Sequence, residues 1–178
     1  MISRDEALEL IKQQNPEPHM VQHALASEAV MRELARQLGE DEELWGLTGL
    51  LHDVDFPHTK DAPEKHGAMA EDLLAGKLPG EAVRAIKAHN GECTGVMPDC
   101  RFDYALRAAE TVTGMVNAAA LVRPTGYDGM EAKSLKKKMK DKAFAANVNR
   151  DNIRECEKVG LSLDDFLGLS IRAMAAIQ

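Results

Sequence analysis

Four histidines and one aspartate carry the strongest chemical signal in this sequence. They are His23, the adjacent pair His52 and Asp53, then His66 and His89. The hydrophobic periodicity predicts each of them on the apolar face of a helix, so that all five side chains point inward. Imidazoles and carboxylates that converge from inner helix faces are typical of a metal site.

Glu110 strengthens this prediction, because it is the only charged residue between Arg107 and Arg123. A carboxylate in so apolar a helix must be compensated when it is buried. A bound cation would compensate it and would also account for the histidines, which makes Glu110 a sixth candidate ligand. The alternative is a buried ion pair with an Arg or Lys from another helix.

This mixed set of ligands favours a divalent transition metal (Fe, Mn, Zn, Co or Ni) over calcium. We expect one or two ions, with His23, His52, Asp53 and Glu110 around the first, His66 and His89 around the second, and Asp53 bridging. Two ions roughly 3.5–4 Å apart stabilise both the attacking and the leaving oxygen of a phosphoryl transfer, and a metal lowers the pKa of its bound water to about 7. The candidates therefore predict phosphoryl transfer by metal-bound hydroxide.

Composition predicts the fold that must position these residues. The 178 residues contain 4% aromatics and many Ala, Leu and Met, which favours an all-α, single-domain helical bundle. A net charge of −7 argues against a nucleic-acid or anionic membrane partner. Neither a signal peptide nor an apolar run of membrane-spanning length is visible, so we expect a cytoplasmic protein.

Three cysteines, Cys93, Cys100 and Cys156, are odd in number and form no Cys-x-x-Cys pair. This spacing predicts free thiols and neither a disulfide framework nor a structural zinc site.

Periodicity and capping signals also predict the individual helices. A first helix follows Ser3 and ends before Asn15. Phe56 to Pro63 is predicted as a loop, and His66 lies in the first turn of the helix after it. The other helices are expected at about 18–38, 41–54, 80–89, 103–122, 150–159 and 162–175. The lysine-rich stretch 133–142 is predicted to be a short helix, either a solvated face or a basic lid over the site.

The order His, His-Asp, His, His, carboxylate resembles the HD-domain superfamily of metal-dependent phosphohydrolases. The resemblance covers about residues 19–124, which leaves 125–178 as a helical extension packed on that core. It implies the HD-type bundle, and the two middle histidines place the chain nearer the members with binuclear sites. One departure is Glu110, where the family usually has Asp; the longer side chain puts the strength of the first metal site in doubt.

We therefore expect a phosphoric ester hydrolase that acts on a nucleotide or another small phosphate ester. In this hypothesis His52 and Asp53 carry catalysis, and Lys60, Lys65 and Arg123 grip the substrate phosphate unless they are ordinary surface charge. The same ligands also suit a di-iron oxygenase, and a non-catalytic ligand-binding or regulatory module is the third possibility. The sequence predicts no oligomeric state.

Two further residues remained open on the sequence alone. His19 competes with His23 for the first ligand position, although its spacing to the following Leu-Ala-x-Glu-Ala run fits less well. Asp55 is interpreted either as a partner that orients a ligand imidazole or as a simple helix-end carboxylate.

Overall fold

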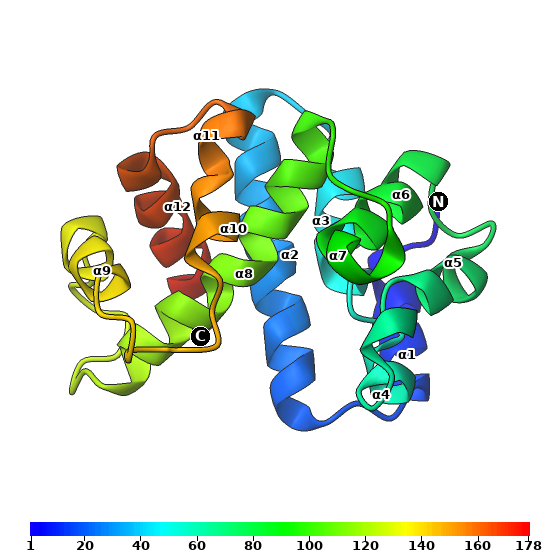
Figure 1. Ribbon diagram of the computed structural model, residues 1–178, viewed down its shortest axis with the longest axis horizontal. Coiled ribbons are helices and arrows are strands. Elements are labelled where there is room, and N and C mark those ends of the chain that lie inside the picture. The colour runs from blue at the N-terminus through cyan, green and yellow to red at the C-terminus, as the bar shows by residue number, and fades with distance from the viewer.

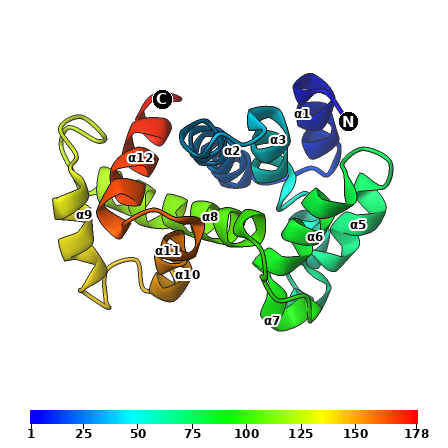
Figure 2. The ribbon, with the colours of Figure 1, turned by 90° about the horizontal axis from the view of Figure 1, so that it is seen from above.

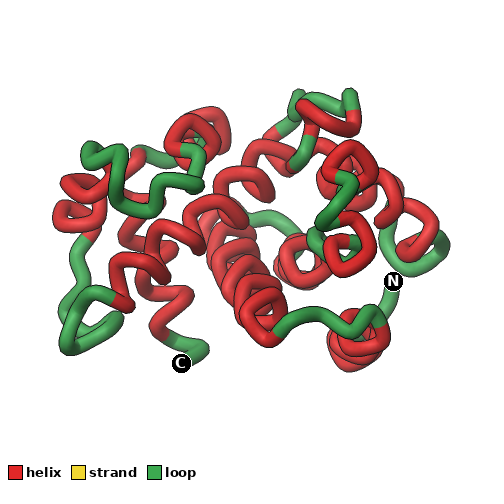
Figure 3. The backbone as a smooth tube through the Cα atoms, turned by 60° about the horizontal axis from the view of Figure 1, so that its bottom comes forward, coloured by secondary structure: helices red, strands yellow, loops and turns green.

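The protein is built entirely from helices and connecting loops (Figure 3). The computed structural model describes residues 1–178 and contains no strand, which confirms the predicted all-α class. The helices are α1 (Arg4–Gln13), α2 (Pro18–Leu38), α3 (Glu42–Leu51), α4 (Phe56–Thr59), the 3-10 turn η1 (Pro63–Lys65), α5 (Ala68–Leu74), α6 (Gly80–His89), α7 (Gly91–Thr94), α8 (Arg101–Leu121), α9 (Ala132–Met139), α10 (Arg150–Arg154), α11 (Cys156–Val159) and α12 (Leu163–Ala175).

Two long helices, α2 and α8, pack against each other at the centre of the bundle (Figure 1). Pro18 occupies the first turn of α2, where its missing N–H costs nothing, and Gly39 ends the helix in the left-handed conformation with φ 73°. Helix α3 packs closely on α2, because a Cβ at Gly49 would lie 2.7 Å from the carbonyl oxygen of Ser27. This close approach fixes the end of α3 against the inner face of α2.

The remaining helices lie on the two sides of this central pair (Figures 1 and 2). Helices α1 and α3 to α7 occupy one side, and α6 packs on α8. Helices α9 to α12 occupy the other side, where α10 and α11 pack on α8 and α12 packs on both α2 and α8. None of the helices has the combined length and hydrophobicity that crossing a lipid bilayer requires.

Four sequence predictions about local structure were wrong. The single helix expected at 150–159 is divided at Glu155 into α10 and α11. The third helix ends at Leu51 and continues as a turn, so Asp53 is not helical. The predicted loop 56–63 contains the one-turn helix α4. His66 lies before α5 in extended backbone, because Gly67 adopts φ 84°, a value that interrupts a helix and that L side chains rarely adopt.

Candidate metal centre

Five of the predicted side chains meet where the helices of one side face α2 and α8. His23 comes from the second turn of α2, His52 and Asp53 from the turn that ends α3, His66 from the link before α5, and His89 from the last residue of α6. His52 is fully buried and the other four are buried or half-buried. Residues up to 66 positions apart in the chain therefore form one cluster.

The histidines of this cluster form two pairs on either side of Asp53. His23 Nε2 lies 3.0 Å from His52 Nε2, and His66 Nε2 lies 3.0 Å from His89 Nε2. The Asp53 carboxylate serves both pairs, because Oδ1 is 3.2 Å from His66 Nε2 and 3.4 Å from His52 Nε2. The result is two groups of three possible ligands, His23 with His52 and Asp53, and Asp53 with His66 and His89.

Backbone carbonyl groups fix the ring orientation of one histidine in each pair. His52 Nδ1 donates a hydrogen bond to the Gly49 carbonyl oxygen at 2.8 Å, and His89 Nδ1 donates to the carbonyl oxygen of Ile86. A carbonyl oxygen can only accept, so the proton of each neutral ring lies on Nδ1 and its lone pair on Nε2.

The other two histidines reach the same tautomer through side chains. His66 Nδ1 donates to Asp55 Oδ1 at 3.0 Å. The Thr113 hydroxyl donates its own proton to the Glu110 carbonyl oxygen at 2.7 Å, and it therefore accepts from His23 Nδ1 at 2.9 Å. Asp55 is thus an orienting partner of a candidate ligand, which resolves the two interpretations of this residue.

This arrangement suits a bound cation. All four Nε2 atoms are directed into one small region, and within each pair the two Nε2 atoms lie 3.0 Å apart. Two lone pairs at that distance repel unless a proton or a metal ion lies between them. Histidine whose Nδ1 proton is held by an oxygen, with Nε2 left open, is also the usual arrangement of a metal ligand. The donor set therefore fits one or two transition-metal ions.

Burial and neighbouring charge set the protonation of the cluster in opposite directions. Burial, reinforced by His52, lowers the pKa of His23 to about 4. Burial also acts to lower the pKa of His66, but hydrogen bonds to Asp53 and Asp55 outweigh it and raise that pKa to about 10. His52 above all, with hydrogen bonds from His66 and His89, overcomes the burial of Asp53 and holds the pKa of its carboxyl well below the usual range. Asp53 is therefore an anion among four imidazoles.

Glu110 stands apart from the five clustered residues. Its side chain lies on α8 in the wall of the same pocket, and it does not belong to either group of three possible ligands. Thr111 Oγ1 donates a hydrogen bond to Glu110 Oε1. Burial raises the pKa of the Glu110 carboxyl, although His89 and His52 act to lower it. The structure therefore brings five of the six predicted ligands together and leaves the sixth beside them.

The cluster lies at the base of a pocket of about 380 Å³ that opens to solvent. Four side chains of the cluster line it, together with the residues Phe56, Asn90, Glu92, Glu110, Thr111, Gly114, Asn147, Val148, Asn149 and Asn152. Residues 147–152 precede and begin α10, so the C-terminal extension forms one wall. This pocket, which we call the metal pocket, gives a small molecule access to the candidate metal centre.

Comparison with known proteins agrees with this geometry. The sequence model of the HD domain family matches residues 20–143, which include the clustered histidines, Asp53 and Glu110. The chain belongs to the HD-domain family. No curated protein and no solved structure matches it. Membership establishes the HD-type fold. HD domains commonly bind divalent metals, and the clustered residues could hold such an ion, while the reaction and the substrate stay open.

The basic residues predicted to grip phosphate lie outside the pocket of this HD domain. Lys60 and Lys65 are exposed, and Lys60 Nζ is 3.9 Å from Glu17 Oε1. The Arg123 guanidinium donates hydrogen bonds to the carbonyl oxygens of Gly126 and Asp128, and so it stabilises its own turn. None of the three lines the pocket that contains the cluster.

Several residues of the site were missed by the sequence interpretation. Three asparagines of the C-terminal extension, Asn147, Asn149 and Asn152, line the metal pocket. The spacing Asn-x-Asn-x-x-Asn is visible in the sequence, but nothing local ties it to histidines more than fifty residues away. Thr113, in line with Glu110 on α8, was noted only as part of the helix stripe. His19 lies outside the cluster and is exposed.

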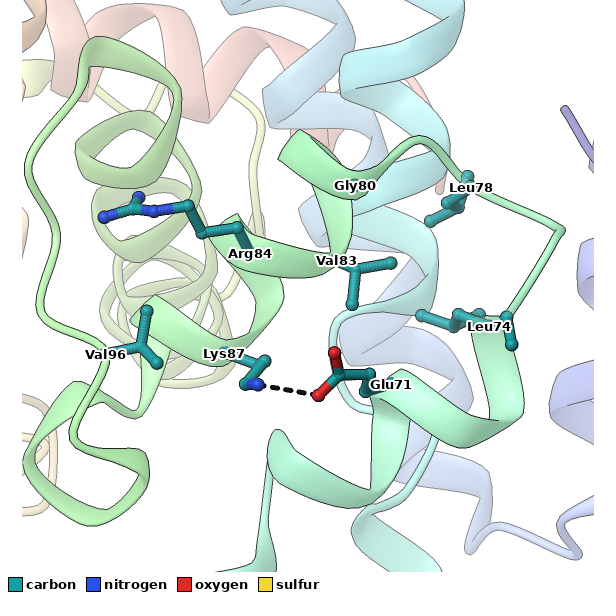
Figure 4. Close-up of a pocket in the computed structure, with 9 residues that line it drawn as sticks. Glu71, Leu74, Leu78, Gly80, Val83, Arg84, Lys87 and Val96 are labelled. Atoms are coloured by element: carbon teal, nitrogen blue, oxygen red, sulfur yellow. Dashed lines mark hydrogen bonds and ion pairs between the residues drawn. The ribbon is translucent and has the colours of Figure 1, made fainter.

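A second hollow of similar size, about 370 Å³, lies between α5 and α6 of the HD domain (Figure 4). Its charged groups are already paired, because Lys87 Nζ is 2.6 Å from Glu71 Oε2 and Arg84 Nη2 is 2.7 Å from Asp99 Oδ2. No histidine lines this hollow, and none of the clustered residues belongs to it. The metal pocket is therefore the better candidate for a reaction site.

Proposed function

We propose that this HD-domain protein is a metal-dependent phosphohydrolase that cleaves a small phosphate ester. The observation that carries the proposal is the pair of His–His contacts that share Asp53 at the base of an open pocket. Two groups of possible ligands with a common carboxylate are the arrangement that hydrolytic phosphoryl transfer uses. The partner of the protein is then a small phosphorylated molecule, such as a nucleotide or another metabolite.

We infer a cofactor of one or two divalent transition-metal ions. His23, His52 and Asp53 would hold one ion, and Asp53, His66 and His89 would hold the other. Ions bound there would supply a hydroxide nucleophile at neutral pH and would neutralise negative charge on the phosphate oxygens. The imidazole-rich donor set suits Fe, Mn, Zn, Co or Ni and does not choose among them.

The residues of the chain have distinct roles in this proposal. Each Nδ1 proton is held by one of four residues, namely Gly49, Ile86, Asp55 and Thr113. These bonds keep every Nε2 turned toward Asp53. Glu110 faces the same pocket, and burial favours the protonated form of its carboxyl. A carboxyl in that state is placed to give a proton to the oxygen that leaves the phosphorus.

The decisive experiment combines metal content with turnover. Protein purified without oxygen or chelator is expected to contain one to two ions per chain by elemental analysis and to hydrolyse a panel of phosphate esters. His52→Ala should lose both the metal and the activity while it keeps most of its helical content. His58→Ala is the matched control, because His58 is exposed and binds only Gln14. Turnover that survives in His52→Ala contradicts the proposal.

The same panel separates the two competing functions. The ligand set would serve a di-iron oxygenase equally well, and oxygen consumption without phosphate release would establish that function instead. Tight binding of a phosphorylated ligand by the metal-loaded protein, with neither hydrolysis nor oxygen uptake, would assign a regulatory binding module. Either outcome overturns the hydrolase.

A further inference from the structure

Another pocket, distinct from the hollow between α5 and α6, adjoins the metal pocket, and we call it the side pocket. Its volume is about 310 Å³, and it shares two lining residues with the metal pocket, His23 and Gly114. Helices α2 and α8, the loop after α8 and the C-terminal end of α12 form its walls. A molecule whose phosphate lies at the metal centre therefore has a second space within reach, across Gly114.

Gly114 lies where the linings of the two pockets meet. It is exposed in the middle of α8, where a glycine destabilises a helix relative to alanine. A Cβ at this position would meet a single neighbour within 4 Å, Val148 Cγ2 at 3.0 Å, which belongs to the wall of the metal pocket. The glycine is thus not required by a close contact between helices. A side chain at this position would stand where the linings of the two pockets meet.

Uncharged polar groups dominate the lining of the side pocket. Gln22 and Asn117 are exposed, so their amides are accessible to a ligand, and Gln178 lies beside them. Tyr127 adds a half-buried phenol, which burial keeps protonated by raising its pKa. Amide and phenol groups each donate and accept hydrogen bonds, which suits ligand hydroxyl groups that do the same.

The charges of the two pockets restrict the ligand further. Neither pocket is lined by a Lys or an Arg, and the metal pocket carries Glu92 and Glu110 besides Asp53. The basic groups of the side pocket are the imidazoles of His19 and His23, so a chain of several phosphates would lie there without a Lys or Arg partner, whereas a single phosphate would be served by the metal centre. Tyr127 is the one Phe, Tyr or Trp of the side pocket, so no aromatic pair encloses a flat base.

We propose that the side pocket binds the uncharged, hydroxyl-rich part of the substrate, so that the substrate is the monophosphate of a polyol or sugar that spans Gly114. This assignment rests on the proposed phosphohydrolase function. Gly114 and Asn117 then determine specificity by shape and hydrogen bonding, and they take no part in the chemical step.

Two substrates and two variants test the proposal by activity. The metal-loaded protein should hydrolyse sorbitol 6-phosphate with a kcat/KM at least about tenfold above that for ethyl phosphate, which cannot reach the side pocket. Gly114→Val and Asn117→Ala should each remove about tenfold of that preference through KM. Turnover of ethyl phosphate should be unaffected in Asn117→Ala, because Asn117 lines only the side pocket, whereas Gly114 lines both pockets. Gly168→Ala is the control for a mid-helix glycine, because Gly168 lies in α12 outside both pockets. If either variant changes kcat/KM for both substrates equally, the proposal is overturned. A higher kcat/KM for a nucleoside monophosphate than for sorbitol 6-phosphate also overturns it.

A binding experiment separates this proposal from the hydrolase itself. Unesterified sorbitol, added to the metal-loaded protein, should shift the side-chain amide NMR signals of Gln22 and Asn117, and Gly114→Val should reduce that shift. Such shifts without hydrolysis of any phosphate ester would refute the hydrolase and retain the side pocket as a polyol site. Hydrolysis of phosphate esters without these shifts would retain the hydrolase and refute the side pocket.

Discussion

Asp55 holds His66 and the start of α5 with a single carboxylate. Its Oδ1 accepts the His66 Nδ1 proton at 3.0 Å, while its Oδ2 accepts the backbone N–H groups of Gly67 at 2.7 Å and Ala70 at 3.1 Å. The side chain is fully buried, so these bonds are not exchanged for water. The orientation of one candidate ligand is thereby tied to the fold around it.

Replacing Asp55 by asparagine should weaken one half of the metal centre. The asparagine oxygen can still accept from the backbone of α5, but its NH₂ group then faces His66 Nδ1 and favours the wrong tautomer. We expect metal affinity on the His66 and His89 side to fall about 10- to 100-fold, the usual cost of losing such a partner. Titration against a competing chelator measures it, with the exposed Asp61→Asn as the control. Equal affinities in the two variants would show that Asp55 does not orient His66.

The variant Glu110→Gln should show whether Glu110 is a metal ligand or only lines the pocket. Because Glu110 lies outside both groups of three possible ligands, we expect the glutamine variant to keep its metal content. Hydrolysis should nevertheless slow by about 10²- to 10⁴-fold, because the amide cannot donate the proton that the buried carboxyl would supply. Elemental analysis and steady-state kinetics on the same sample test this. Loss of metal in proportion to activity would instead make Glu110 the sixth ligand.

The ion pair between Arg107 and Glu155 should be essential to stability. The two side chains are 6% and 9% exposed, and Arg107 Nε is 2.7 Å from Glu155 Oε2. Arg107→Ala leaves the buried carboxylate with only the exposed Lys158 beside it, whose Nζ is 3.6 Å from Glu155 Oε1. We therefore expect the free energy of unfolding to fall by about 3–5 kcal/mol. Urea denaturation measures the change. Arg101→Ala, which breaks only an exposed pair with Glu40, should cost at most about 1 kcal/mol. A similar loss in both variants would refute this assignment.

The three cysteines should differ in reactivity as their burial does. Burial raises the pKa of the Cys156 thiol to about 12, whereas Cys93 and Cys100 are exposed. The thiolate is the reactive form, so at pH 8 Cys156 should resist iodoacetamide while the other two are alkylated. Mass spectrometry of intact and digested protein should find two modified sites, and a third only after denaturation. Rapid alkylation of Cys156 in the folded chain would contradict the packing of α11.

The sequence predicted the helices that local signals determine. Helix α2 begins and ends where predicted, because Pro18 and Gly39 act on their own neighbours. Helix α6 likewise runs from Gly80 to His89, as expected. The all-α class and the HD-type family followed from composition and from the order of histidines, and both are confirmed.

Features that depend on packing between distant segments were not predictable in the same way. The position of His66 was wrong because a helical stripe was assigned to a segment that Asp55 and Gly67 hold in another conformation. The lysines expected at the mouth of the pocket lie outside it, and asparagines from residues 147–152 line it instead. The sequence of residues 147–152 does not predict that they line the pocket, because their position there depends on how α10 packs on α8.

The asparagine wall lies beyond residue 143, where the match to the HD domain family ends. The residues that would hold the metal and the asparagines of this wall thus stand on different stretches of the chain. Mutation can exchange the second stretch while the first is kept, provided that Arg107 and Glu155 still join α8 to the extension. Relatives with the same reactive centre are therefore free to diverge in the compounds they accept, and a library randomised at 147–152 would explore that freedom directly.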